Sequence, residues 1–393
     1  MPKRTLAVIS LAVFSSMLGV GIIAPILPDY VKSFDVTNLW VGLIFSGFSF
    51  ARALMMPVWG RISDHKGRKA FITGGLVVVT VSALGYPWAS SIYALLGVRL
   101  LHGMASAAVL PISQAYVGDS AAKGEEGKLM GYFSAAYFTG FGAGPLLGGI
   151  LTDQFNTTTA FYTMAALNLL SLLLVISLLP EAQRRKTKDR AIRSFGEIIS
   201  SNIVRGLISF RMTYALARGA FNSFLPLFAG TYLGLSKTQI GLLLGTNALV
   251  MSLSQIRFGR LADRFNKRRL VIIGSLITPV IYMVFIPLMH NFWQLLALCI
   301  VAGLGGAVCM PSALALGTQE GRKFGMGSTM ATVTMAMSIG FALGPTLGGW
   351  IADVAGNIGS TFYFGSIMGL IGISLFAWFT RRYGTNDRPH EGE

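Results

Sequence analysis

Long apolar stretches alternate with short polar ones along the whole chain. Each apolar stretch is about twenty residues long, the length that an α-helix needs to cross the ~30 Å hydrocarbon core of a bilayer. Strand-length segments of alternating polarity are absent from the sequence. The pattern therefore predicts an all-α integral membrane protein with twelve transmembrane helices, at 6–30, 40–59, 70–90, 93–117, 129–152, 160–179, 204–232, 238–258, 269–289, 292–316, 326–352 and 361–380.

Composition agrees with a membrane location. The chain is 53% hydrophobic and only 12% charged, whereas about a quarter of a soluble domain is charged. The net charge of +16 would suit a nucleic-acid partner, but the basic residues are spread over the short segments between spans. We therefore expect the lipid bilayer as a partner, no nucleic acid, and a monomer.

Charge distribution predicts the topology. One long polar segment separates the sixth and seventh spans and divides the chain into 1–180, a linker 181–203, and 204–393. Of the 32 Lys and Arg residues, 26 fall on the side of the N-terminus and two, Lys32 and Lys237, on the other. The remaining four lie within spans: Arg52, Arg99, Arg211 and Arg218. The positive-inside rule then places both termini and the linker in the cytoplasm, with the protein in the cell (inner) membrane.

The two halves of the chain repeat each other. The segment GFGAGPLLGG at 140–149 returns as GFALGPTLGG at 340–349, and Asp153 and Asp353 follow at the same offset of 200. Repeats of this size indicate duplication. Parallel repeats with a binding cavity at their interface are typical of secondary transporters, so two pseudo-symmetric six-helix bundles are expected.

A charged segment between the second and third spans also has a copy. It reads GRISDHKGRK at 60–69 and GRLADRFNKRR at 259–269, with Asn266 where the first copy has Gly67. Because apolar runs flank it, we expect a short charged hinge between two membrane helices.

These segments resemble signatures of the major facilitator superfamily. The segment at 60–69 is similar to the pattern G-x-L-A-D-x-x-G-R-K, and Arg99–Gly103 is similar to R-x-x-Q-G, with His102 in place of glutamine. The segment at 140–149 resembles the antiporter motif of drug:proton exporters in that family. The resemblance covers essentially the whole chain and implies a twelve-helix secondary transporter that works by alternating access.

The resemblance also implies roles for particular residues. It implies a conformational latch on the cytoplasmic side, formed by Gly60, Asp64, Gly67 and Arg68, with Asp263 in the second copy. It implies a part in proton transfer for Arg99. It implies a pivot between the halves in the fifth span, carried by Gly140, Gly144, Pro145, Gly148 and Gly149.

Ionisable residues inside spans are functional hypotheses in their own right, since burying a charge in lipid is costly. Arg99 has Cys299 as its counterpart in the second half, so the repeat is broken at this position. His102 has an unperturbed pKa near neutrality, and Asp29, at the outer end of the first span, is the most embedded acid. We therefore take Asp29, Arg99 and His102 as proton-coupling candidates.

None of the sixteen acidic residues lies in the middle of a span. A cavity that contains arginines from the spans and no acid to balance them favours anionic, zwitterionic or neutral compounds over cations. The alternative is that backbone carbonyls or Asp29 satisfy each arginine and leave a merely apolar cavity. Arg211 lies nearer the cytoplasmic end of its span, where a long side chain can extend to the membrane surface. Candidate cavity residues are Met17, Arg52, Gln114, Tyr137, Arg218 and Asn222.

The function expected from these features is proton-coupled export of small amphiphilic compounds, of the multidrug-efflux kind. Two alternatives stay open: a carrier or flippase for an anionic lipid-like or organic-anion substrate, and a non-transporting sensor or scaffold with the same fold. The sequence has no P-loop, and its four histidines lack metal-ligand spacing. We therefore expect neither an enzyme nor a cofactor nor a metal site.

Overall fold

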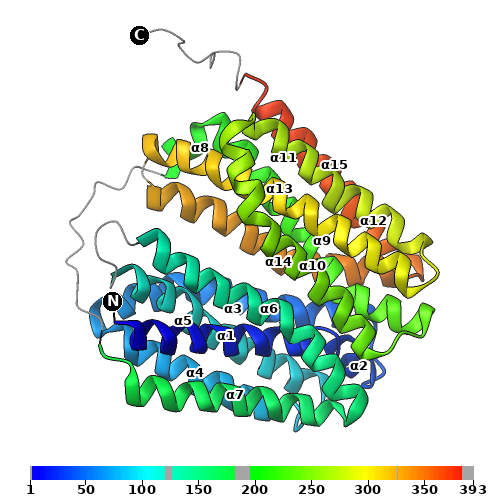
Figure 1. Cartoon of the computed structure of the whole chain (residues 1–393). Helices are drawn as coiled ribbons and strands as arrows, with labels where there is room; N and C mark the ends of the chain where they lie inside the picture. Colours follow the sequence, from blue (N-terminus) through cyan, green and yellow to red (C-terminus); the bar gives the residue numbers. More distant parts are fainter. Residues whose placement is uncertain (1, 120–125, 182–194, 325, 383–393) are drawn as a thin grey trace.

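Each of the twelve predicted spans coincides with one helix or with a run of consecutive helical segments. The computed structural model describes residues 2–119, 126–181, 195–324 and 326–382 (Figure 1). The side chains of some residues inside these ranges, Asp64 and Asp263 among them, also lie outside the description. Throughout the described ranges the regular structure is helical.

The described residues of the first half of the chain form seven helices. They are α1 (Lys3–Ile23), α2 (Leu27–Lys32), α3 (Asn38–Lys66), α4 (Arg68–Gly85), α5 (Ile92–Asp119), α6 (Glu126–Gln154) and α7 (Thr157–Leu178). The predicted first span is interrupted between α1 and α2, because Pro25 and Pro28 remove backbone donors and disfavour helix in the residues before them.

The charged segment at 60–69 is not the loop that its composition indicated. α3 continues through it to Lys66 and α4 begins at Arg68, so a single residue, Gly67, separates the two helices. Gly67 has φ of 105°, a conformation that glycine adopts without the steric cost of a Cβ atom.

The second half is also helical. Its elements are α8 (Phe195–Ser200), α9 (Asn202–Leu233), α10 (Lys237–Arg264), α11 (Lys267–Ser275), the π-helical segment η1 (Leu276–Ile281), α12 (Tyr282–Phe285), the 3₁₀ turn η2 (Ile286–Leu288), α13 (Phe292–Phe324), α14 (Met326–Ala355) and α15 (Ser360–Phe379). The ninth span is divided among α11, η1, α12 and η2, and Pro279 lies within its π-helical segment. Residues 182–194 of the predicted linker lie outside the described part, and α8 follows them.

The helices form two groups that exchange contacts across their interface. α1 packs against α6 and α7 in the first group, and α9 packs against α14 and α15 in the second. Between the groups, α3 packs against α14 and α6 against α10. In Figure 1 the two groups lie one above the other and meet at the right of the view. The predicted fold class, two pseudo-symmetric helix bundles, is thus confirmed.

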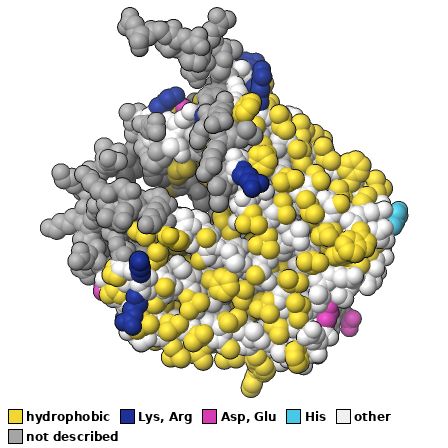
Figure 2. Space-filling view, in the orientation of Figure 1, with side chains coloured by type: hydrophobic (Ala, Val, Ile, Leu, Met, Phe, Trp, Pro, Cys, Tyr) yellow, Lys and Arg dark blue, Asp and Glu magenta, His cyan; other side chains and the backbone are white. Residues whose placement is uncertain are grey.

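The outer surface is suited to lipid. Large apolar side chains are exposed, such as Trp88, Leu253 and Trp293, and hydrophobic side chains cover the middle of the face shown in Figure 2. Nine helical segments of the described part are long and apolar enough to cross a membrane. α6, α9 and α10 lie outside that set and pack alongside its members.

Candidate functional site

A cavity of about 580 Å³ lies between the two groups of helices. Its wall is formed by α1, α3, α5 and α6 on one side and by α9, α10, α13 and α14 on the other. Five of the six sequence-predicted cavity residues line it, namely Arg52, Gln114, Tyr137, Arg218 and Asn222. Met17 is not among the lining residues; it is 1% exposed, within the hydrophobic core.

Arginine side chains reach this cavity from both groups. Arg52 on α3 and Arg99 on α5 line it from the first group, and Arg211 and Arg218 on α9 line it from the second. Arg211 is only 7% exposed, so its side chain does not extend to the membrane surface. α9 turns that side chain toward the cavity.

Much of the wall is aromatic. Tyr137 packs edge-on against Phe138 and parallel to Phe141, with ring centroids 5.0 and 6.4 Å apart. Phe45 and Phe48 line the opposite part of the first group. Flat apolar surfaces with few polar groups are typical of sites for small organic ligands.

Arg99 belongs to a buried network that also contains His102. Its guanidinium donates to the carbonyl of Ile44 (3.1 Å) and the hydroxyl of Tyr86 (3.2 Å), and it lies 4.6 Å from the ring centroid of Phe48. The Tyr86 hydroxyl also bonds His102 Nδ1 (3.0 Å). Unlike Arg99, His102 is fully buried and does not line the cavity.

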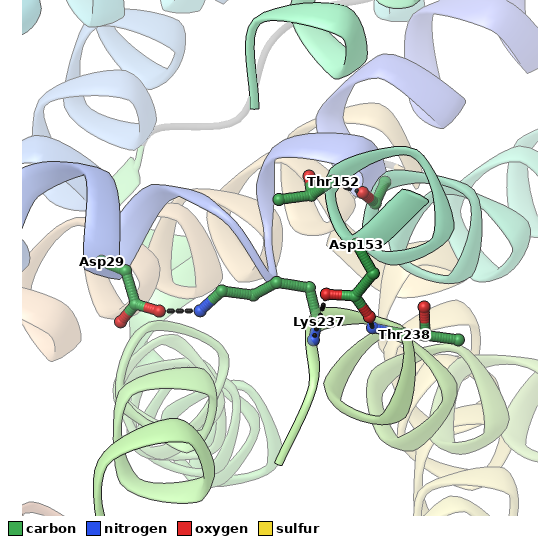
Figure 3. Close-up of polar contacts among 6 residues, drawn as sticks. Asp29, Thr152, Asp153, Lys237 and Thr238 are labelled. Atoms are coloured by element: carbon green, nitrogen blue, oxygen red, sulfur yellow. Dashed lines mark hydrogen bonds and ion pairs between the residues drawn. The ribbon is translucent and has the colours of Figure 1, made fainter. Parts of the chain in front are cut away.

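One end of the interface is closed by a carboxylate that caps a helix of the other group. Asp153, at the end of α6, accepts from the backbone N–H groups of Lys237 (3.0 Å) and Thr238 (2.7 Å), the first residues of α10 (Figure 3). Burial opposes ionisation of Asp153, but these hydrogen bonds, with those from the side chains of Thr238 and Ser236, together lower its pKa. An anion at a helix N-terminus also meets the positive end of the helix dipole.

The second group repeats this arrangement in the opposite direction. Asp353, at the end of α14, accepts from the backbone N–H groups of Asn38 (2.8 Å) and Leu39 (2.7 Å), where α3 begins. We call this end, at which α3 and α10 begin and α6 and α14 end, the closed end.

Asp29 adds an ion pair at the closed end. Its carboxylate contacts the ammonium of Lys237, which joins α2 to α10 (Figure 3). The Asp29 side chain is 39% exposed and that of Lys237 19%, so water still reaches the carboxylate.

The glycines of the predicted pivot lie at close helix contacts. Gly140, Gly144 and Gly148 face the backbone of α1, and a Cβ atom at any of them would collide with a main-chain carbonyl. Gly149 faces the backbone of Lys237 in the other group, and Pro145 lies against Gly241. The motif therefore contacts both sides of the interface.

The predicted latch is described only in part. None of the described residues lies within 4 Å of a Cβ built at Gly60. Gly67 lies close to the carboxylate of Glu181, which also accepts from the backbone N–H of Lys69 (3.2 Å). Arg68 donates to the hydroxyl of Ser63 (3.1 Å). The side chains of Asp64 and Asp263 lie outside the described part, so the latch stays a prediction.

Sequence reasoning missed several groups at these sites. It left Arg211 and Tyr214 out of the cavity, although the i, i+3, i+7 spacing with Arg218 places all three on one face of α9. It noted Asp153 and Asp353 as a repeat without giving them partners. Within the described residues, no group of three His, Cys, Asp or Glu side chains could hold a metal ion.

Comparison with known proteins places the chain in a family. The model described as Major Facilitator Superfamily matches residues 9–215 and 207–393. An uncharacterized MFS-type transporter of Methanocaldococcus jannaschii is 29% identical over 376 residues, which cover 94% of this chain and 96% of that protein. A multi-drug resistance efflux pump PmrA homolog of Lactococcus lactis is 28% identical over 384 residues, with 95% and 92% covered.

Among solved structures, a bacterial homolog of the human lysosomal transporter Spinster, in an inward-facing and unoccupied conformation, superposes with a TM-score of 0.83. The match covers 97% of this chain and 98% of that one at 14% identity, and it reflects the fold. The chain therefore belongs to the Major Facilitator Superfamily and is a multi-pass membrane transporter, a member of a family of transporters rather than of enzymes.

Proposed function

We propose that this transporter exports small amphiphilic compounds in exchange for protons. The observation that carries the proposal is the cavity of about 580 Å³, which has a mostly apolar, partly aromatic wall and lies between two bundles joined at the closed end. Pockets of this size hold drug-sized molecules. The relative named as a multi-drug resistance efflux pump supports the same substrate class.

The charge distribution supports this orientation of the protein in the membrane. The basic segments lie on the side of the N-terminus, which the positive-inside rule assigns to the cytoplasm. The closed end then faces outward and the cavity takes up its substrate from the cytoplasmic side. Export requires the contacts at Asp153 and Asp353 to separate while the opposite ends of the bundles approach each other.

Proton coupling is assigned to Asp29, with Arg99 as the buried cation of the first group. The ion pair between Asp29 and Lys237 joins the two groups. A proton that enters from outside and neutralises Asp29 removes the charge attraction at this contact, which favours opening of the closed end.

Purified protein in liposomes with an imposed pH gradient tests the proposal. We expect an amphiphilic probe to move against its concentration gradient, and to stop when a protonophore collapses the pH gradient. Asp29→Asn is expected to lose most gradient-driven transport and to keep exchange of probe across the membrane without a gradient, because the cavity is unchanged.

Asp35→Asn is the matched control. Asp35 is an exposed acid on the same side of the protein, and its φ of 54° is one that asparagine tolerates. Its substitution should leave transport unchanged. Absence of movement for cationic, neutral and anionic amphiphiles alike, or movement that persists after the gradient is collapsed, would contradict proton-coupled export.

A further inference from the structure

Four polar side chains form a line on one face of α9. Arg211, Tyr214, Arg218 and Asn222 all line the cavity. Their spacing of three and four residues keeps them on the same side of the helix. At 1.5 Å per residue the line is about 16 Å long. We call these four residues the α9 stripe.

The cationic groups of the α9 stripe are poorly compensated. Arg211 Nη1 contacts the thioether sulfur of Met310, a weak acceptor, at 3.0 Å, and its buried Nε has no hydrogen-bond partner among the described residues. The hydroxyl of Tyr214, which is 6% exposed, and Nη1 of Arg218 are also buried and unpartnered. Among the described residues that line the cavity, none is Asp or Glu.

Arg99 shows the contrasting case within the same cavity. Its guanidinium donates to a carbonyl and a hydroxyl and lies over an aromatic ring. The Cζ of Arg218 lies 5.7 Å from the ring centroid of Phe221, and its buried Nη1 has no hydrogen-bond partner among the described residues. Arg99 in the first group is thus already hydrogen-bonded, whereas Arg211 and Arg218 in the second group carry donor atoms that have no hydrogen-bond partner among the described residues.

The pseudo-symmetry of the fold shows that the α9 stripe is special to the second group. Gly21 in α1 packs on Pro145 as Gly219 in α9 packs on Pro345, which fixes the alignment of the two helices. In that alignment Val13, Ser16 and Val20 correspond to Arg211, Tyr214 and Arg218. A mere packing role would not require two arginines where the same fold uses valines.

We propose that the α9 stripe is an anion-binding site and that the substrate is an amphiphile with a carboxylate, sulfonate or phosphate group. The inference rests on the proposed transport function and names its substrate class. A guanidinium fork matches such groups with two parallel hydrogen bonds, and a buried charge without a partner is costly. The anionic group lies on Arg211 and Arg218, and the apolar body lies against Tyr137 and the aromatic wall of α6.

Binding to the purified protein in a neutral detergent tests the site without transport. The probes share one fluorescent naphthalene body and carry a sulfonate, a hydroxyl or a trimethylammonium group. We expect the sulfonate to bind most tightly. Arg218→Gln and Arg211→Gln should each weaken sulfonate binding by about tenfold or more, the size of a charged hydrogen bond, while the hydroxyl probe changes little.

Three further variants separate binding from folding. Arg211→Lys and Arg218→Lys keep the charge and should retain part of the affinity for the sulfonate. Arg205→Gln removes one positive charge from the same helix at an exposed position outside the cavity, and should leave all three affinities unchanged. Because Arg211 is buried and nearly unpaired, Arg211→Gln should melt at the same temperature as the parent or higher.

A second set of binding measurements distinguishes a lipid head group from a soluble organic anion as the ligand of this site. A two-chain phosphatidic acid with a fluorescent acyl chain is compared with the single-ring sulfonate in the same variants. Stronger competition by the lipid, lost in Arg218→Gln, assigns the site to a lipid head group; stronger binding of the small sulfonate assigns it to a soluble organic anion.

The outcomes also separate this inference from the transport proposal. A trimethylammonium probe that binds as tightly as the sulfonate, or sulfonate binding that survives Arg211→Gln together with Arg218→Gln, would overturn the anion site even if gradient-driven transport is intact. Sulfonate binding that depends on both arginines in a protein that moves no probe in liposomes would support the site and refute the transport function.

Discussion

The surroundings of His102 would stabilise a positively charged imidazolium ring only weakly. It is fully buried, its Nδ1 bonds the Tyr86 hydroxyl, and Nε2 has no partner. The guanidinium of Arg99 bonds the same hydroxyl. A proton carrier needs access to water or to the substrate, and this geometry instead favours a neutral ring that holds Tyr86 in place.

We therefore expect His102→Gln to keep gradient-driven transport within about twofold of the parent, because glutamine supplies a hydrogen-bonding group of similar reach. His102→Leu leaves the buried Tyr86 hydroxyl with one partner fewer and should lower the free energy of unfolding by about 1–3 kcal/mol. Liposome transport and thermal melts measure the two effects. Loss of coupling in a well-folded His102→Gln protein would return His102 to the proton pathway.

Prediction of single residues from the sequence succeeded where contact with lipid would be too costly for the side chain. Arg52 and Arg218 lie in the middle of spans and have to face the interior, and both line the cavity. Arg211 lies near enough to a span end that extension to the surface and burial fit the same pattern, and only the rotation of α9 decides between them. Met17 belongs to α1, which packs against helices on several sides, so its spacing does not identify a cavity face.

At the scale of the helix, glycine positions in α6 separate two kinds of contact. Gly144 faces the carbonyl of Leu18 within its own group, and Gly149 faces the carbonyl of Lys237 in the other group. Gly131, on the same helix, has none of the described residues within 4 Å of an added Cβ. An added side chain should therefore disrupt the fold at Gly144, disrupt the contact between the two groups at Gly149, and do neither at Gly131.

We expect Gly144→Val to destabilise the protein by several kcal/mol, since a backbone contact leaves no room for repacking. Gly149→Val should fold and melt near the parent temperature, while the closed end is pushed apart and export slows. Gly131→Val is the control for added bulk and β-branching. A Gly149→Val protein with parent-like transport would show that the contact at Lys237 adapts without cost to the cycle.

The ends of helices could be predicted from the sequence only where residues nearby in the sequence determine them. Apolar runs placed all twelve spans, but charge at 60–69 was interpreted as a loop although α3 continues to Lys66. Helices that project beyond the bilayer tolerate charged residues, and only Gly67 breaks the backbone there. Similarly, Asp153 and Asp353 were visible as a repeat, but their partners lie in the opposite half, and no spacing in the sequence indicates a contact between halves.

At the scale of the whole molecule, the two carboxylate caps set the balance between the closed end and its opened form. Each carboxylate accepts from two backbone N–H groups with its two oxygens, and asparagine keeps only one acceptor oxygen, a loss of about 1 kcal/mol. The two caps join different pairs of helices. Asp153→Asn and Asp353→Asn should each raise the opened population by about fivefold, and the double variant by about the product, if the caps act independently.

Spin labels at residues 155 and 232, both exposed and on different groups, measure this balance as a distance distribution. The direction in which this balance changes with pH can be predicted from Asp153. The pKa of Asp153 is lowered in the closed form by its hydrogen bonds, so its contribution to closure is complete above the ordinary carboxyl pKa of about 4 and is lost as pH falls through the lowered value.

In Asp353→Asn, where Asp153 is the remaining cap, the contribution of Asp153 to closure should thus stay constant between pH 7 and about pH 5 and be lost only under stronger acid. The double variant should lack this acid-dependent step, and Asp35→Asn should behave as the parent. The acid-dependent step carried by Asp153 should persist when Asp29→Asn is added to Asp353→Asn, which separates it from the ion pair between Asp29 and Lys237. A closed population that is unchanged when both caps are substituted would show that the glycine contacts alone hold the closed end together.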